Sequence, residues 1–142
     1  MTATYLPEGL PQPRPQRDGL DKPYWEGLAQ GILRIQCCNA CGTWQWGPEW
    51  ICHSCRSFTV GWKEIEAKGR IFSWARSWHP VHPALRERGP YIFALIELPH
   101  AGGIRMVGNL IGDAMQKVEI GGEVVGVFEA HGQYSLLQWR RV

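Results

Sequence analysis

The feature that most constrains this sequence is a cysteine cluster between Cys37 and Cys55, which holds all five cysteines of the 142-residue chain. The cluster contains two C-x-x-C pairs, and ten residues separate the first pair from the second. Two thiolates with two residues between them can bind one metal ion from a tight turn, and a second such pair completes a tetrahedron. Gly42 follows the first pair, where the turn needs a residue that tolerates positive φ. The spacing therefore predicts a zinc ribbon whose ligands are Cys38, Cys41, Cys52 and Cys55.

Disulfide bonds are the alternative use of such pairs, and they persist mainly in secreted proteins. The first twenty residues lack the apolar core of a signal peptide, and no run is long enough to cross a bilayer. Disulfide pairing would also leave one thiol over. Cys37 and His53 are further possible ligands, but Cys38 keeps the two-residue spacing to Cys41 and four thiolates already close the site. We therefore expect a structural zinc ion in a cytoplasmic protein that has no membrane segment.

The charge balance bears on the class of partner. Fifteen lysines and arginines stand against thirteen acidic residues, a net charge of +2, whereas nucleic-acid-binding domains usually carry a basic stripe. We therefore expect no nucleic-acid partner. Eight tryptophans are many for this length, and they either cover a metal module with little core of its own or form an aromatic surface for a partner. Four of them lie in or beside the cysteine cluster, namely Trp44, Trp46, Trp50 and Trp62.

The amino-terminal part divides into an arm and a helix. Residues 1–20 contain prolines at positions 7, 11, 13 and 15, which favour an extended arm that can lie along another subunit. Residues 21–36 predict a short helix, with Asp21 as its N-cap and Gly31 as its stop, and then a lead-in strand. One face of this helix must be buried, and in so small a chain a neighbouring protein can cover it. That face consists of Tyr24, Trp25 and Leu28.

Residues 37–67 form the predicted ribbon, and residues 68–142 read as strands separated by glycine turns. We expect five strands, with a short helical connection capped by Asp113 between the third and the fourth. Five antiparallel strands must close or leave edges, and the five-stranded OB-fold barrel fits their order. The predicted fold is mainly β: an N-terminal helix, a zinc ribbon and a C-terminal OB-fold barrel. From the alternation we expect a core of Phe72, Trp74, Ile92, Ala94, Ile96, Val107, Val125 and Val127.

This order of parts resembles the acyl-CoA-associated family in which a helical amino terminus precedes a rubredoxin-like zinc ribbon and an OB-fold. The resemblance covers Tyr24 to the end of the chain and does not extend to the arm. It is carried by Tyr24-Trp25, Gly31, Leu33, the two cysteine pairs with Gly42 and Pro48, and the segments 69–74, 90–98, 108–110 and 120–124. Their order and spacing together are specific, although each is weak alone.

The resemblance implies a non-catalytic accessory subunit that binds a thiolase-like enzyme and helps to hold the CoA thioester. It leaves open whether the partner is a thiolase, an acyltransferase, a steroid side-chain aldolase or a hydratase. In such complexes the chemistry resides in the partner, so we assign no catalytic residue. OB-folds usually bind ligands at their loops, and guanidinium groups suit phosphate oxygens. The candidates for contact with CoA or the partner are therefore Arg76, His79, His82 and Arg86.

Two other functions remain compatible with the sequence. Zinc ribbons and OB-folds also occur in modules that bind single-stranded nucleic acid, for which a salt-dependent shift with oligonucleotides is the test. A small enzyme that uses His79 and His82 is the second alternative, and turnover by the purified chain alone would favour it.

Overall fold

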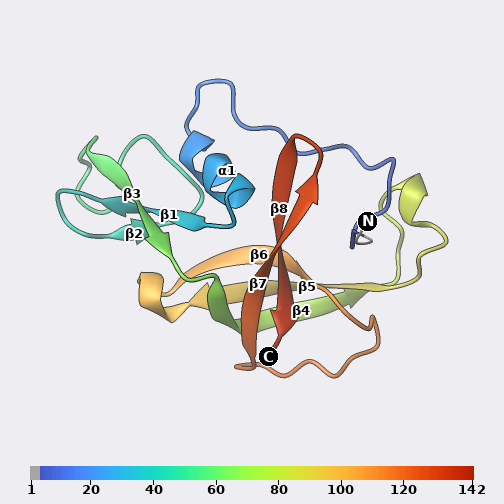
Figure 1. The fold of residues 1–142 in the computed structure, drawn as a ribbon. Coiled ribbons are helices and arrows are strands. Elements are labelled where there is room, and N and C mark those ends of the chain that lie inside the picture. The colour runs from blue at the N-terminus through green and yellow to red at the C-terminus, as the bar shows by residue number, and fades with distance from the viewer. Residues whose placement is uncertain (1–3) are drawn as a thin grey trace.

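A small sheet and a closed barrel lie side by side in the computed structural model, with a single helix packed against both (Figure 1). The structure describes residues 4–142. The elements are α1 (Lys22–Ala29), β1 (Leu33–Cys38), β2 (Trp44–Gln45), β3 (Val60–Ile65), β4 (Lys68–Ser77), the 3₁₀ turn η1 (Pro83–Leu85), β5 (Tyr91–Leu98), the 3₁₀ turn η2 (Pro99–Ala101), β6 (Ile104–Leu110), β7 (Glu123–His131) and β8 (Tyr134–Arg141).

The helix begins and ends where the sequence predicts, but its amino terminus is held differently. Asp21 occupies the N-cap position without a side-chain capping bond. Its carboxylate instead accepts hydrogen bonds from the Trp25 indole, at 3.0 Å, and from the Gln16 backbone N–H, at 2.8 Å. Gly31, just beyond the helix, adopts φ +72°, the left-handed conformation that glycine tolerates best.

The apolar face of α1 is covered within this chain, and the expectation that a neighbouring protein covers it is wrong. Leu28 is buried, and Tyr24 and Trp25 pack against the same core. The Tyr24 ring meets Trp46 of the ribbon at 4.9 Å between centroids, and the Trp25 ring meets Tyr134 of the barrel at 6.2 Å. The helix therefore joins the ribbon to the barrel.

The ribbon sheet has the order β2-β1-β3, with β1 at its centre and all pairs antiparallel. The barrel has the order β4-β5-β6-β8-β7 and closes between β4 and β7. A short parallel pairing of β6 with β8 connects its two halves through Leu110 and Trp139. Five strands in this closed arrangement confirm the predicted mainly β fold with a helix, a zinc ribbon and an OB-type barrel.

The predicted core is correct on β5 and wrong at Phe72. Ile92, Ala94 and Ile96 are buried. On β4, the register shifts between Ile71 and Ser73, so Ile71 points inward before this bulge and the half-buried Trp74 packs on the core after it. A bulge reverses the faces of a strand, which leaves Phe72 43% exposed beneath the guanidinium of Arg105.

The predicted inward faces of β6 and β7 are also wrong. Val107 is 70% exposed, whereas Met106 is buried. On β7 the buried residue is Val124, and the half-buried Val125 and Val127 lie outside the core cluster. Both strands carry apolar residues on both faces, so alternation alone does not choose between the two registers.

The connection from β6 to β7 is irregular, and the predicted helical turn is reduced to a single turn, closed by the Gln116 N–H, which donates to the Asp113 carbonyl at 3.1 Å. Asp113 does cap this turn, because its carboxylate accepts a hydrogen bond from the Met115 N–H at 2.8 Å. No element is assigned between Leu110 and Glu123. Across the described residues, no helix is long and apolar enough to span a membrane.

Candidate functional site

The four predicted ligands converge at one end of the ribbon. Their sulfur atoms all lie within 4.8 Å of one another. The two pairs interdigitate, because Cys38 Sγ is 3.6 Å from Cys55 Sγ and Cys41 Sγ is 3.6 Å from Cys52 Sγ. Four sulfurs in this arrangement fit one tetrahedral zinc ion and leave no position open for a substrate.

The two halves of the site are built as near-repeats. In the first, the Gly42 N–H donates to the Cys38 carbonyl at 2.8 Å, and in the second the Arg56 N–H donates to the Cys52 carbonyl at 3.0 Å. Both residues have positive φ, +75° at Gly42 and +64° at Arg56. Both turns thus need one residue in a left-handed conformation. The first turn has a glycine at this position, and the second has an arginine.

The protonation of the thiols also fits a cation. The hydroxyl and the backbone of Thr43 hydrogen-bond to Cys41 and lower its pKa to about 6. At Cys55 the Ser57 backbone lowers the pKa, but desolvation and the neighbouring thiols outweigh it and raise the value to about 12. Four adjacent thiols cannot all ionise without a positive charge among them, and a zinc ion supplies that charge.

Cys37 and His53 lie outside the sulfur cluster. The Cys37 thiol is buried and donates to the Gly42 carbonyl at 3.4 Å, so it supports the first turn. His53 donates from Nδ1 to Gln45 Oε1 at 2.9 Å. Gln45 in turn donates to the buried Gln36 at 2.9 Å, and Gln36 binds both backbone groups of Glu49 at 3.0 Å. Two buried amides therefore hold the loop between the cysteine pairs.

The four residues predicted to contact CoA or the partner have different roles. Arg76 donates to the carbonyls of Ala114 and Gln116, both at 2.8 Å, and so fixes the β6–β7 connection. His82 caps η1, because its Nδ1 accepts from the Ala84 N–H at 3.1 Å. His79 and Arg86 are exposed. Two of the four thus hold backbone segments of this chain, and the other two are open to solvent.

Sequence reasoning missed a buried polar network on the outer face of the barrel. Asn109 on β6 donates to Gln138 on β8 at 3.1 Å, and Gln138 lies 3.5 Å from Glu129 on β7. His131 donates from Nε2 to the same carboxylate. Gln138 is only 2% exposed although its side chain points away from the core, since its neighbours Leu137 and Trp139 are buried. The signal in the sequence was the polar pair Glu129 and His131, two apart on one face of a strand.

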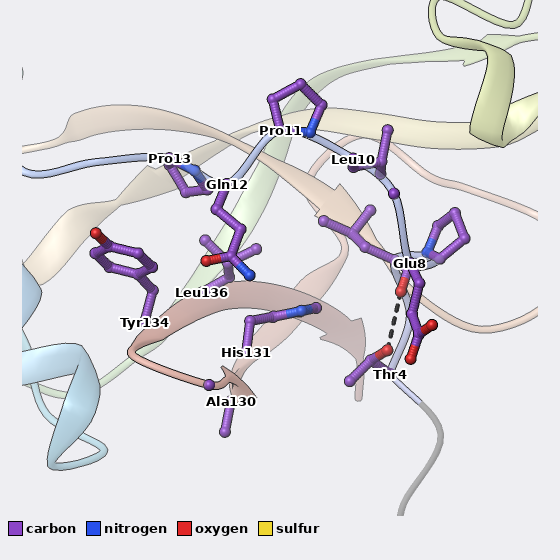
Figure 2. A pocket seen from close by; sticks show the side chains of 14 residues that line it. Thr4, Glu8, Leu10, Pro11, Gln12, Pro13, Ala130, His131, Tyr134 and Leu136 are labelled. Carbon is purple, nitrogen blue, oxygen red and sulfur yellow. Dashed lines mark hydrogen bonds between the residues drawn. The ribbon is translucent and has the colours of Figure 1, made fainter.

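A cavity of about 440 Å³ lies beside this network, between the arm and the β7–β8 hairpin. Figure 2 shows His131, Tyr134 and Leu136 on the hairpin side, with Leu10 and Pro13 of the arm opposite. The arm therefore runs along its own barrel.

Comparison with known proteins decides the family. A family model described as "ChsH2, rubredoxin-like zinc ribbon domain" matches residues 25–61, and one described as "ChsH2, C-terminal OB-fold domain" matches residues 62–129. A solved structure described as "Ltp2-ChsH2(DUF35) aldolase" is 36% identical, with a TM-score of 0.78, over 92% of this chain and 98% of the matched chain. The chain belongs to the ChsH2 family.

Two curated relatives are longer than this chain. The chain is 41% identical over 115 residues to the "Probable enoyl-CoA hydratase alpha subunit" of Thermomonospora curvata, covering 80% of this chain and 34% of that protein. It is 29% identical over 136 residues to the "3-oxo-4,17-pregnadiene-20-carboxyl-CoA hydratase alpha subunit" of Mycobacterium tuberculosis, covering 94% of this chain and 40% of that protein. The chain thus spans well under half the length of either relative.

A more distant structure shares the fold alone. A DUF35-family protein of unknown function from Sulfolobus solfataricus is 17% identical, with a TM-score of 0.60, over 85% of this chain and 84% of the other.

Proposed function

We propose that this chain is a non-catalytic accessory subunit of a cytoplasmic complex with a thiolase-like enzyme that processes an acyl-CoA, and that Cys38, Cys41, Cys52 and Cys55 hold a structural zinc ion in it. The observation that carries the proposal is the likeness to a chain of the Ltp2-ChsH2(DUF35) aldolase over 98% of its length. Both curated relatives are named as hydratase subunits for a CoA thioester, which supports an acyl-CoA as the shared ligand.

In this proposal the partner supplies the nucleophile or base and the oxyanion hole. This chain orders the walls of the channel with the β4–β5 loop, residues 78–90. His82 stiffens that loop by capping η1, and Arg76 anchors the β6–β7 connection. The exposed Arg86 and His79 are then the side chains available to CoA phosphates. Ordering alone can lower a reaction barrier by several kcal/mol, roughly 7–11 in favourable cases.

The same loop carries apolar groups suited to a protein partner. Trp78 is 66% exposed and Val81 is 71% exposed, on either side of His79. Large exposed aromatic residues are costly in water and are frequent energetic centres of interfaces. Trp78 is therefore the proposed anchor of the complex.

Reconstitution with the partner enzyme tests the proposal. Partner alone should be insoluble or weakly active, and addition of this chain should restore turnover. The changes His79→Ala and His82→Ala should each lower activity by about tenfold or less, roughly 1.4 kcal/mol. A loss of a thousandfold would show that a histidine takes part in the chemistry, and the accessory role would have to be abandoned.

A matched pair of surface variants tests the docking loop. Trp78→Ser should weaken association with the partner by at least tenfold, about 1.4 kcal/mol, measured as the concentration of this chain that restores half of the maximal turnover. Phe58→Ser is the control, because Phe58 is 78% exposed on the ribbon. Equal effects of the two changes would place the interface elsewhere.

A further inference from the structure

The arm crosses from one ligand-binding loop of the barrel to the other. In Figure 1 it starts beside the β4–β5 loop and passes the tip of the β7–β8 hairpin on its way to α1. In OB-folds these two loops and the face of the second and third strands, here β5 and β6, bind the ligand. The arm therefore contacts both of the loops that flank the ligand face of an OB-fold.

Tyr5 attaches the arm to both sides of this face. Its backbone N–H donates to Glu129 Oε2 at 2.7 Å, on the hairpin side. Its ring lies under the guanidinium of Arg88, 4.0 Å from the ring centroid, on the β4–β5 loop side. Burial raises the pKa of the Tyr5 hydroxyl, which agrees with a covered ring. These are the contacts by which a groove holds a peptide: a charged acceptor for a backbone amide and a cation over an aromatic ring.

The groove side of these contacts is preorganised. Glu129 is held by His131 and lies beside Gln138, whose amide also binds Asn109. The side chain of Glu129 is only 11% exposed. A buried carboxylate without enough hydrogen bonds is costly, and with the arm in place the Tyr5 N–H supplies one of the bonds that this carboxylate accepts.

The arm itself is bound loosely. Within residues 4–13, the Tyr5 N–H makes the one hydrogen bond to the barrel that the described structure contains, and no part of this segment joins a sheet. A cavity of about 440 Å³ separates it from the hairpin (Figure 2). Leu6 and Leu10 both line that cavity and are half-buried. This is the contact pattern of an exchangeable ligand rather than of a core element.

We propose that the face between the β4–β5 loop and the β7–β8 hairpin is a peptide-binding groove, and that residues 4–13 of this chain are its resident ligand. The groove takes an extended, proline-containing segment with an aromatic residue followed by leucines. The arm ties the β4–β5 loop to the hairpin while it is bound. Another ligand that needs this face must first displace it.

A synthetic peptide of residues 4–17, labelled with a fluorophore, tests this on the full chain without any partner enzyme. The double change Tyr5→Ala, Leu6→Ser weakens the tethered arm and leaves the groove intact. A tethered competitor acts at an effective concentration of about millimolar, so the peptide should bind the double variant at least tenfold more tightly than the wild type. Equal affinity for both proteins, or no binding to the variant, would overturn the proposal.

Two controls keep the result interpretable. Adding Glu129→Gln to the double variant should reduce peptide affinity at least fivefold, whereas adding Phe58→Ser, at an exposed position on the ribbon, should not. In the wild type, the Tyr5 amide should exchange with solvent at least tenfold more slowly than the amide of the exposed Gln12. An unprotected Tyr5 amide would contradict the proposal even if the variants failed to fold.

Discussion

The ribbon and the barrel are stabilised in opposite ways. The ribbon buries Cys38, Cys52, Gln36 and Gln45, so cysteines and amides occupy much of its interior. The barrel interior is apolar, and Trp139 is the largest of its fully buried side chains. A metal site concentrates stability in four atoms, whereas an apolar core distributes it over many contacts. Loss of a single zinc ligand should therefore unfold the ribbon as a whole. Substitutions in the barrel should instead lower its free energy of unfolding by amounts that depend on how much buried side chain is removed.

The largest effect should come from removing a zinc ligand. Cys38→Ser should abolish zinc binding, which contributes on the order of 10 kcal/mol to the folding of such modules, and should unfold the ribbon while the barrel amides stay protected. Metal analysis together with hydrogen exchange measures both. Cys37→Ser should keep one zinc per chain, because a hydroxyl can replace the thiol as donor to Gly42. If the two changes behaved in reverse, Cys37 would be the ligand.

The next largest effect belongs to the barrel. Trp139→Ala removes a side chain that is 1% exposed and should lower the free energy of unfolding by about 3–5 kcal/mol, measured by denaturant titration, with zinc content unchanged. Val107→Ala should change stability by about 0.5 kcal/mol or less, because Val107 is mostly exposed. Loss of zinc from the Trp139 variant would show that the two regions do not respond independently.

The two cysteine turns should differ by a smaller amount. Gly42 has φ +75° with no atom within 4 Å of an added Cβ, so Gly42→Ala tests backbone strain alone and should cost about 1–2 kcal/mol. Arg56→Gly relieves the same strain at φ +64° and should be neutral or stabilising by about 1 kcal/mol or less. Thermal unfolding of both variants gives the comparison. A destabilising Arg56→Gly would mean that the side chain of Arg56 matters more than its backbone.

The smallest effect should be the release of the arm from the barrel at low pH. Burial raises the pKa of Glu129, but hydrogen bonds from Tyr5, His131 and Gln138 outweigh it and leave the value lowered. A carboxyl with a lowered pKa stabilises the bound arm above its ordinary range, about 4.3, and this is lost as the pH falls through the lowered value. The protection factor of the Tyr5 amide, which compares its exchange with that of an unstructured peptide at the same pH, should therefore fall as the pH drops below the ordinary range of a glutamate. Glu129→Gln should remove this pH dependence, although His131 and Arg88 remain nearby.

The sequence was most informative where chemistry fixes spacing. Two residues between cysteines are enough to specify a turn and a ligand pair, and the structure brings the four predicted sulfurs together. The strand count of the barrel was also predictable, because glycine turns separate its strands.

The inward faces of the barrel were not predictable at Phe72 or Val107. A bulge between Ile71 and Ser73 reverses β4 without any residue that marks it. On β6, Gly108 faces the Trp139 ring, and an added Cβ would lie 2.5 Å from it. Because Gly108 must face the Trp139 ring, β8 determines which residues of β6 point inward, and β8 lies about thirty residues further along the chain. The course of the arm likewise depends on Glu129 and Arg88, which no local pattern connects to Tyr5.

The short link between the two regions has a use beyond folding. Only Glu66 and Ala67 separate β3 from β4, and both carbonyls are bound, by His100 at 2.9 Å and by the Gly126 N–H at 2.6 Å. Trp44 of the ribbon also packs against Gly102 next to η2. The metal site is thus held in a fixed position relative to the barrel. Cobalt(II) accepts tetrahedral sulfur ligands and is paramagnetic. Cobalt bound in place of zinc would therefore allow the distance from the ribbon to any bound molecule to be measured by magnetic resonance.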